Sequence, residues 1–547
     1  MRWTLAVIFL ALTVQITGCG GQQTSSSSRL GRSVILGGTH TSEPSPPPVA
    51  TSPSRPSRPG RPASMLTPWP NDVRINTLVS NHGVSTAGEP GIAAVADGAG
   101  GTFIAWEDSG GGVIRTQRLD AAGNKLWPGG VVSTSPAYQA SPSAVSDGSG
   151  GWFVAWIDGR NGSCDSTAEL SCALFIQRVG PAGLRIWGDD GLQVSAQARY
   201  PSANRVAVIS DGAGGAYIAW SSGTSYYNCC SFYMQSIGPD GQTRWAANGV
   251  RVSELPSFIT GPGITGARLV PDQNGGAIIS WWNQQTADGS TILTAQRIDP
   301  SGNLLWPGEG VQVPFTGAGH ANFDAASDGT GGVVFAVQSN DIPKSSNTHV
   351  YLQRVSADGE VMWGETGVQV SPALGAQITP SLVADGEGGA FVSWAVWDLK
   401  TIVNNHISVQ HVDTAGTLTW SAEAKVTATS KAQTNPHILA DGGGVIVAWE
   451  DCRTINSTDS DCIAAYDIYA QRIDSTGKPS WTTEGLPITF AKANQGVDYG
   501  AEKRPGFEMI PDGNGGVVFL WPDGRLLKNC AAGLPGLCDL YAQHLAP

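Results

Sequence analysis

One phrase recurs eight times along this chain of 547 residues. It begins with a DGxGG-like turn and continues with an apolar run that usually ends in Trp. A Gln follows, usually with Arg, and every copy except the last closes on a Gly and another Trp. A unit that recurs every 50 to 71 residues predicts a radial or linear array of similar structural units. The eight turns begin at Asp97, Asp147, Asp211, Asp272, Asp328, Asp385, Asp441 and Asp512.

Each copy is expected to contain four short strands. Residues 152–156 of the second copy alternate large apolar residues with smaller ones, and a period of two is typical of a strand. A second hairpin follows, in which a strand that ends at Gln117 or its equivalent leads through a short Gly-bearing turn to a strand that begins at Trp. We therefore expect antiparallel meanders, with strands named a to d in chain order.

The two ends of the repeat region predict how the array closes. The last copy stops at residues 543–547 without a fourth strand, whereas residues 69–75 resemble the d strands of the other copies. An N-terminal strand that completes the last blade would remove the exposed edges of an open stack. The expected fold is therefore all-β, an eight-bladed β-propeller of four-stranded antiparallel blades over residues 66–547. A linear solenoid is the alternative.

Composition and charge limit the range of partners. The chain carries 71 Gly and only 14% charged residues, which is typical of a turn-rich protein with a large apolar core. Its formal net charge of −13 argues against nucleic-acid binding and against a peripheral contact with anionic lipid. We expect a monomer that meets the membrane only through an anchor.

The N-terminus predicts that anchor. Residues 1–19 have the positive start and short apolar run of an export signal, and the stretch from Ile16 to Cys19 resembles the bacterial lipobox, whose Cys is lipidated. An ordinary signal peptide cut nearby is the alternative. Gly20 at the next position points to the outer membrane or cell surface of the bacterial envelope. Residues 20–65 are rich in Ser, Pro and Thr and are expected to form a disordered tether.

Eight further cysteines support export to an oxidising compartment. Three pairs lie 8 to 10 residues apart, each within one b-to-c connection, where a local disulfide would staple a long loop. No His accompanies any pair at zinc-ligand spacing, so metal binding is the weaker alternative. Two adjacent cysteines either bridge each other or pair separately. The expected pairs are Cys164 with Cys172, Cys452 with Cys462 and Cys530 with Cys538, and the adjacent residues are Cys229 and Cys230.

Loop lengths predict a cleft. In a meander, the a-to-b and c-to-d turns share one end of every blade, and the b-to-c and d-to-a connections share the other. From the last apolar residue of strand b to the Gln of strand c there are 21, 22 and 22 residues in copies two, seven and eight, but 11 in copy one. Closing the ring places copy one between tall neighbours, which predicts a notch above it.

The same four copies carry charged residues directly after strand b. Copies two, seven and eight share the pattern W-x-D-x-R, and copy one has Trp-Glu-Asp without the Arg. An Arg fork beside a carboxylate could bind a polar ligand such as a glycan or a carboxylate. In the alternative, the Asp caps its loop and the Arg pairs within the blade. The candidate ligand-binding residues are Glu107, Asp108, Asp158, Arg160, Asp451, Arg453, Asp523 and Arg525.

No catalytic constellation, metal site or cofactor is predicted. The turn Asp residues provide too few oxygen ligands for calcium and are interpreted as turn formers. The His residues show no triad spacing and no nucleophile elbow. An Arg that recurs on strand c is interpreted as a tie between blades through an inter-blade salt bridge; it occurs at Arg118, Arg178, Arg297, Arg354 and Arg472.

The repeats resemble those of two known groups of proteins. Residues 120–127 and 299–306 resemble the Trp-docking motif of eight-bladed quinoprotein dehydrogenases, in which an outer Trp packs on the next blade. That resemblance gives Cys229 and Cys230 a meaning as a vicinal disulfide against pyrroloquinoline quinone. The repeats over residues 69–547 resemble those of uncharacterised bacterial surface lipoproteins, which implies a fold and no activity.

The sequence therefore predicts an exported, lipid-anchored propeller that acts as a binding or scaffolding module, with an envelope or extracellular protein or a glycan as its partner. The alternative is a propeller enzyme, either a quinoprotein-like dehydrogenase or a polysaccharide-acting enzyme. Because no catalytic constellation is recognised, the sequence leaves enzymatic activity open and favours its absence.

Overall fold

In the computed structural model, all residues that the structure describes belong to one compact unit, within residues 55–547. They contain strands and turns but no helix, and so none that could cross a membrane. The described residues are 73–74, 91–108, 112–160, 171–199, 206–222, 231–253, 267–284, 291–317, 319–340, 348–370, 375–397, 405–428, 432–453, 467–489, 506–523 and 539–545.

Within the described ranges, thirty-two strands form eight separate four-stranded antiparallel sheets. The a strands are β2 (Ile92–Ala96), β6 (Gln139–Ser146), β10 (Ala207–Ser210), β14 (Arg268–Pro271), β18 (Gly319–Ser327), β22 (Ala376–Ala384), β26 (Gln433–Asp441) and β30 (Glu508–Pro511). The b strands are β3 (Thr102–Asp108), β7 (Trp152–Asp158), β11 (Ala216–Ser222), β15 (Ala277–Gln284), β19 (Val333–Asn340), β23 (Ala390–Trp397), β27 (Gly444–Asp451) and β31 (Val517–Asp523).

The c strands are β4 (Val113–Leu119), β8 (Ser171–Val179), β12 (Ser231–Ile237), β16 (Thr291–Ile298), β20 (Thr348–Val355), β24 (His406–Val412), β28 (Asp467–Ile473) and β32 (Asp539–Leu545). The d strands are β5 (Gly130–Val131), β9 (Leu192–Arg199), β13 (Val250–Arg251), β17 (Val311–Val313), β21 (Val368–Gln369), β25 (Ala424–Lys425), β29 (Leu486–Pro487) and β1 (Val73–Arg74). Most d strands are shorter than predicted and begin after the Trp that was expected to open them.

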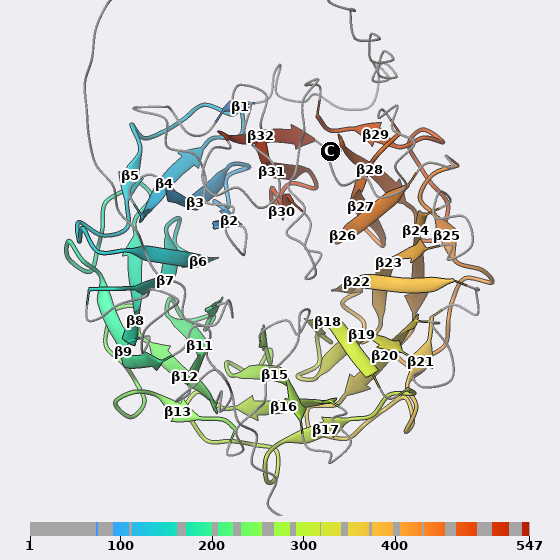
Figure 1. Ribbon diagram of the computed structural model, residues 1–547, viewed down its shortest axis with the longest axis horizontal. Coiled ribbons are helices and arrows are strands. Elements are labelled where there is room, and N and C mark those ends of the chain that lie inside the picture. The colour runs from blue at the N-terminus through green and yellow to red at the C-terminus, as the bar shows by residue number, and fades with distance from the viewer. Residues whose placement is uncertain are drawn as a thin grey trace, which may run out of the picture. The chain divides into compact units, whose positions relative to one another are not determined.

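The sheets form the eight blades of a β-propeller, as predicted from the repeats. Strands such as β2, β6 and β22 lie nearest the centre of the ring, and the d strands lie at its outer edge (Figure 1). Blade eight is assembled from both ends of the repeat region, because β1 pairs antiparallel with β32 and places Val73 opposite Ala542. The N-terminal strand therefore completes the last blade.

The core of the ring lies between neighbouring blades. Eight clusters of buried apolar side chains occur, one at each interface of two adjacent blades. At the closing interface, Ile92 and Trp106 of blade one pack with Leu520 and Leu540 of blade eight. Burial of apolar surface at every interface, including this one, is the main contribution that holds a propeller closed.

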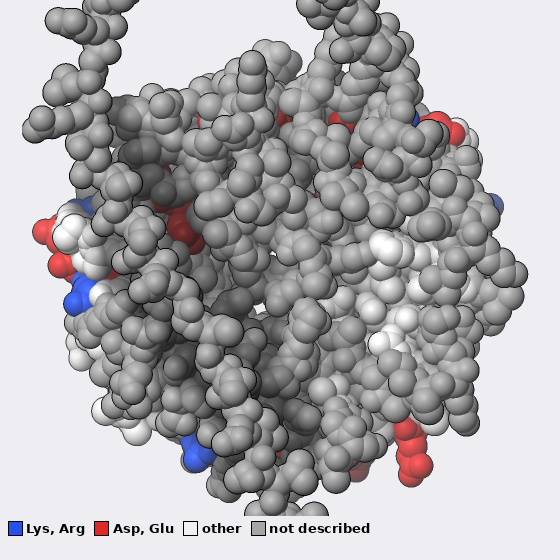
Figure 2. Space-filling model, viewed as in Figure 1, with Lys and Arg blue, Asp and Glu red and all other residues white. Residues whose placement is uncertain are grey.

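The meander gives the ring two different ends. The DGxGG turns between strands a and b and the Gly-bearing turns between c and d lie together on one end, which we call the turn face. The connections from b to c and from d to a lie on the other end, which we call the long-loop face. In Figure 2, most of the visible surface belongs to residues outside the described part of the chain.

Candidate functional site

The Asp that opens each DGxGG turn has a structural role. In blade one, Oδ1 of Asp97 accepts hydrogen bonds from the backbone N–H groups of Ala99 at 2.7 Å and Gly101 at 2.8 Å. Oδ2 of the same Asp accepts from Nη2 of Arg118 at 2.9 Å. The equivalent backbone hydrogen bonds recur in blades two to six and blade eight. This geometry confirms the interpretation of these residues as turn formers.

The strand-c Arg residues connect blades, although not through the inter-blade salt bridges that we predicted. Each pairs with the turn Asp of its own blade. In blade five, Nε of Arg354 lies 3.0 Å from Oδ2 of Asp328, and Nη1 donates to Oγ1 of Thr414 in blade six at 2.6 Å. Burial disfavours the ionised form of Asp328, but hydrogen bonds from the turn and from Arg354 outweigh burial and lower its pKa.

The outer Trp residues dock on the following blade. The indole N–H of Trp306 in blade four donates to the backbone oxygen of Ala357 in blade five at 3.0 Å. Its ring covers Gly359, where a Cβ atom would lie 2.9 Å from the indole. The same contact joins Trp127 to blade two, at Gly183. A glycine is required at this turn because its φ is positive and because the ring leaves no room for a side chain.

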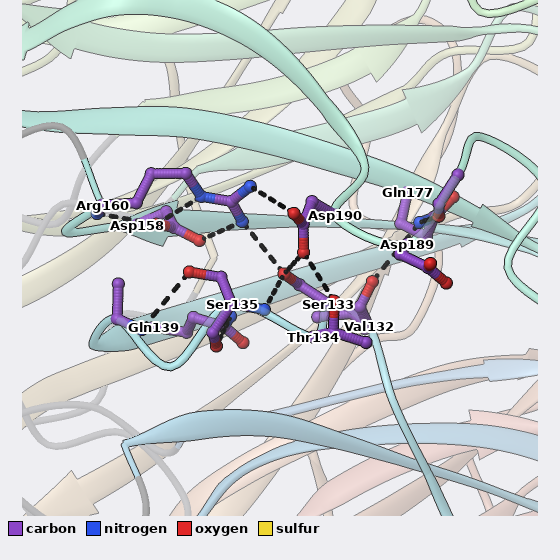
Figure 3. Close-up of polar contacts among 12 residues, drawn as sticks. Val132, Ser133, Thr134, Ser135, Gln139, Asp158, Arg160, Gln177, Asp189 and Asp190 are labelled. Carbon is purple, nitrogen blue, oxygen red and sulfur yellow. Dashed lines mark hydrogen bonds and ion pairs between the residues drawn. The ribbon is translucent and has the colours of Figure 1, made fainter.

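The W-x-D-x-R pattern of blade two forms a compact arrangement that we call an acid–arginine corner (Figure 3). Oδ2 of the fully buried Asp158 accepts from Nη2 of Arg160 at 2.7 Å. The same atom accepts from the indole N–H of Trp156 at 2.9 Å. The guanidinium group stacks over the ring of Phe175 at 3.9 Å. Its Nη2 atom also donates to Oγ of Ser133 in blade one at 3.0 Å.

Blade seven repeats the corner with a deeper arginine. Asp451 is fully buried and accepts from the indole N–H of Trp449 at 2.8 Å and from Nη2 of Arg453 at 2.6 Å. The guanidinium group lies over Tyr469 at 4.0 Å, and Nη1 donates to the backbone oxygen of Glu484 at 2.7 Å. Burial disfavours the charged form of Arg453, but its hydrogen bond and Coulomb attraction to Asp451 outweigh burial and raise its pKa.

Blades eight and one complete a contiguous arc of four blades. In blade eight, Oδ2 of Asp523 accepts from the indole N–H of Trp521 at 2.9 Å. Arg525 lies outside the described residues. In blade one, Asp108 pairs with Arg115, which lies on strand c and takes the place of the missing Arg after strand b.

Glu107 of blade one faces blade two and holds a tyrosine at the start of that blade. Its Oε1 atom accepts from the hydroxyl of Tyr138 at 3.1 Å. Burial, the charge of Glu107 and this hydrogen bond all raise the pKa of Tyr138, so the phenol stays protonated and acts as the donor.

The eight predicted site residues therefore differ in what they can contact. The carboxylates of Asp158, Asp451 and Asp523 have no exposed surface, and each positions a strand-b Trp. Asp158 and Asp451 also position an Arg. Exposed polar groups on this arc belong instead to residues that sequence reasoning missed. Arg115 has 44% of its side chain exposed and Asp190 has 51%.

Asp190 could not be found from the repeat pattern, because it lies outside the repeated phrase, in the c-to-d connection of blade two before β9. Its carboxylate reaches the long-loop face, because it contacts the start of the d-to-a connection that follows β5 of blade one. Oδ1 of Asp190 accepts from Oγ of Ser133 at 3.1 Å and from Oγ1 of Thr134 at 2.9 Å, and Oδ2 lies 4.0 Å from Nη1 of Arg160 (Figure 3). Arg115 could have been predicted from the repeats, because aligning the hairpin of strands b and c places it directly opposite Trp106.

The cysteines fall mostly outside the described residues. Cys172 on β8 and Cys452 directly after β27 are both buried. Cys19, Cys164, Cys229, Cys230, Cys462, Cys530 and Cys538 lie outside the described part of the chain. The disulfide pairings therefore stay predictions. Within the described ranges, no group of three or more His, Cys, Asp or Glu residues is arranged to hold a metal ion.

Comparisons with known proteins find distant similarity to solved structures only. No protein-family model and no curated protein matches the chain. Among solved structures, it is similar to the polysaccharide lyase Uly1, with 10% identity and a TM-score of 0.42 over 72% of this chain and 87% of that chain. It is also similar to a eukaryotic initiation factor, with 10% identity and a TM-score of 0.43 over 87% of this chain and 93% of that chain.

A third similar structure is the Fusarium graminearum α-L-arabinofuranosidase Arb93A in complex with an iminosugar inhibitor. The identity is 10% and the TM-score 0.36, over 74% of this chain and 97% of that chain. Likeness at this level of identity says nothing of what this chain binds or catalyses.

Proposed function

We propose that this protein is an exported, lipid-anchored propeller that acts as a binding module at the bacterial cell envelope, with its long-loop face as the contact surface. The anchor would be Cys19, and residues 20–65 would be the tether. The partner would be an envelope or extracellular protein or a glycan.

The observation that carries this proposal is the grouping of the acid–arginine corners. Asp158, Asp451 and Asp523 each hold a strand-b Trp in the same way, and Asp108 pairs with an Arg of its own blade. These residues lie in blades seven, eight, one and two, which are consecutive around the closed ring. At the positions of these Asp residues, blades three to six carry Ser222, Asn283, Ser339 and Val396 instead.

Fixed charges on one sector of one face are typical of a site that recognises polar ligands. A bidentate Arg–carboxylate pair presents its remaining N–H groups in a defined direction, so less conformational entropy is lost when a ligand binds. The buried Asp residues would act by positioning, and the contact itself would fall to exposed groups such as Arg115 and Asp190.

Disulfide bonds in the long b-to-c connections belong to the same proposal. Cys172 and Cys452 are buried at the ends of strands that border these connections, as half of two predicted pairs. Such bonds would restrict the long loops in an oxidising compartment.

The test compares the two faces of the ring. The whole chain is titrated with a panel of oligosaccharides and of purified envelope proteins, first unchanged and then as Arg115→Glu and Asp190→Lys. Glu360→Lys, on an exposed c-to-d turn of the turn face, is the matched control. We expect the two long-loop variants to weaken binding at least tenfold and the control to bind as the unchanged chain does.

Equal binding by all three variants would contradict the proposal, as would a loss confined to Glu360→Lys. Analysis of the oligosaccharides after incubation separates binding from catalysis, because a polysaccharide-acting enzyme would shorten them. We expect their lengths to stay unchanged.

A further inference from the structure

An exposed tyrosine stands on the long-loop face between blades one and two. Tyr138 is 49% exposed although its backbone is fixed on both sides. Its carbonyl oxygen accepts from the N–H of Gly159 at 2.8 Å, and the N–H of the following residue, Gln139, donates to the oxygen of Gly112 at 2.6 Å. The two partner glycines border the b-to-c connections of blade two and blade one, so the tyrosine is held by both blades.

The ring of Tyr138 is also fixed in direction. Its hydroxyl donates to Glu107, which is 8% exposed. At Gly112, a Cβ atom would lie 3.0 Å from the tyrosine ring, so the absence of a side chain there leaves the ring space against the backbone. A rigid aromatic ring with a bound polar tip and an open apolar face loses little entropy when another flat surface stacks on it.

Two exposed polar side chains lie in the same two blades as this ring, Arg115 in blade one and Asp190 in blade two. Nε of Arg115 is bound by the buried Asp108, and no hydrogen bond of its Nη atoms occurs within the described residues. In blade two, Asp190 is half exposed. Its Oδ1 atom accepts from Ser133 and Thr134, and within the described residues its Oδ2 atom has the long contact to Arg160.

The three exposed groups are spread over two blades. Arg115 stands opposite Trp106, whose ring packs toward blade eight, whereas Tyr138 lies on the side of blade one that faces blade two. Facing sheets are separated by about 10 Å, so groups on opposite sides of one blade are too far apart for a single sugar ring to cover. A linear ligand of several units fits this spread.

The charge of the region decides between neutral and acidic ligands. Among the described residues of this region, the carboxylates of Glu107, Asp108, Asp158, Asp189 and Asp190 outnumber the guanidinium groups of Arg115, Arg160 and Arg185. The whole chain carries a net charge of −13. An added anion would be repelled, by roughly 0.4 kcal/mol for each unpaired charge at about 10 Å in water. Sugar hydroxyls can donate to Asp190 and accept from Arg115 without this penalty.

We propose that the surface formed by Arg115, Tyr138 and Asp190 binds a neutral oligosaccharide, with one sugar ring stacked on Tyr138 and the hydroxyls of neighbouring sugars on Arg115 and Asp190. The inference rests on the proposed function and names the ligand class of its contact surface. The stack uses the apolar C–H face of a pyranose, and the two flanking groups set the direction of the chain.

Calorimetric titration of the whole chain tests the proposal. The probes are neutral hexasaccharides of glucose, xylose and mannose, with hexagalacturonate as the acidic probe. We expect at least one neutral hexasaccharide to bind, and hexagalacturonate to bind at least tenfold more weakly. Tyr138→Ala should raise the Kd of the neutral ligand at least tenfold, whereas Tyr138→Phe keeps the ring and should stay within about threefold.

Leu305→Ala removes an exposed apolar side chain beside a c-to-d turn and serves as the control, with binding unchanged. A thermal melt of each variant confirms that it is folded. The proposal is overturned if no neutral hexasaccharide binds, if hexagalacturonate binds more tightly, or if Tyr138→Ala binds as the unchanged chain does. Binding of an envelope protein to the long-loop face without any oligosaccharide would overturn this inference and leave the proposed function standing.

Discussion

Removal of the turn carboxylate of blade five provides a quantitative test of how the repeats hold the ring together. Asp328 is fully buried and accepts hydrogen bonds from N–H of Thr330 at 2.7 Å, from N–H of Gly332 at 2.8 Å and from Arg354 at 3.0 Å. Asp328→Ala leaves the backbone donors without an acceptor and the largely buried guanidinium without its counter-charge. Breaking a buried ion pair in this way costs about 3–5 kcal/mol.

The assay is thermal and urea unfolding of the whole chain. Unfolding entropy of about 2.1 cal/mol/K per residue gives a domain of this size roughly 1 kcal/mol for each degree, so the midpoint should fall by about 3–5 °C. Asp299→Ala is the matched control. It removes the equivalent Asx turn at a surface position, where the carboxylate accepts from Ser301 at 2.9 Å and from Asn303 at 2.8 Å, and it should cost no more than about 1 kcal/mol.

The pH dependence follows from the sign of the pKa shift. The pKa of Asp328 is lowered in the folded protein, so its contribution is complete above the unfolded value of about 4 and is lost as the pH falls through the folded pKa. The Asp328→Ala variant should therefore lose less stability between pH 5 and pH 3 than the unchanged chain. The reasoning would be refuted if Asp328→Ala and Asp299→Ala lowered the stability equally, or if Asp328→Ala lost as much stability between pH 5 and pH 3 as the unchanged chain.

Two further substitutions test packing at single atoms. Thr294→Val should stabilise the protein by about 1 kcal/mol in urea unfolding, because the buried Thr294 hydroxyl has no hydrogen-bond partner among the described residues. Thr102→Val removes a hydroxyl that donates to two carbonyl oxygens, and it should destabilise the protein by a similar amount. Gly302→Ala should lower the free energy of unfolding by about 1–3 kcal/mol more than Gly212→Ala does. Both glycines have positive φ, but only at Gly302 would a Cβ atom meet the ring of Trp245, at 3.0 Å. A smaller difference would argue against tight Trp docking.

The repeats predicted the ring because each repeated residue makes the same contact in its blade or with the next blade. Asp97 binds its own turn, and Trp306 requires a glycine one blade further on, so spacing alone fixes blade number and closure. The exposed groups of the candidate site have no such constraint. Tyr138 and Asp190 lie in connections outside the repeated phrase, and their proximity to blade one follows from tertiary structure only.

Local strain was likewise invisible in the sequence. Ser141, Thr379 and Asn435 adopt positive φ values of 54°, 51° and 50° at irregularities of strands β6, β22 and β26. Each is followed by a proline, which favours extended backbone at the residue before it. The left-handed conformation is therefore imposed by the register of the neighbouring strands, against the local preference of a β-branched residue such as Thr379.

The pairing of β1 with β32 also determines when the molecule can finish folding. Val73 meets Ala542, so the last blade needs residues from both ends of the repeat region. Blades one to seven can form in order as the chain emerges, because each uses a continuous stretch of sequence. Until residue 545 has arrived, the growing arc has an open strand edge at one end and an uncovered apolar blade face at the other, which are the surfaces by which incomplete repeat proteins aggregate. Under the proposed function the chain would cross a membrane before it folds, and it would then need protection along its whole length. A truncation of a few C-terminal residues would affect the entire ring.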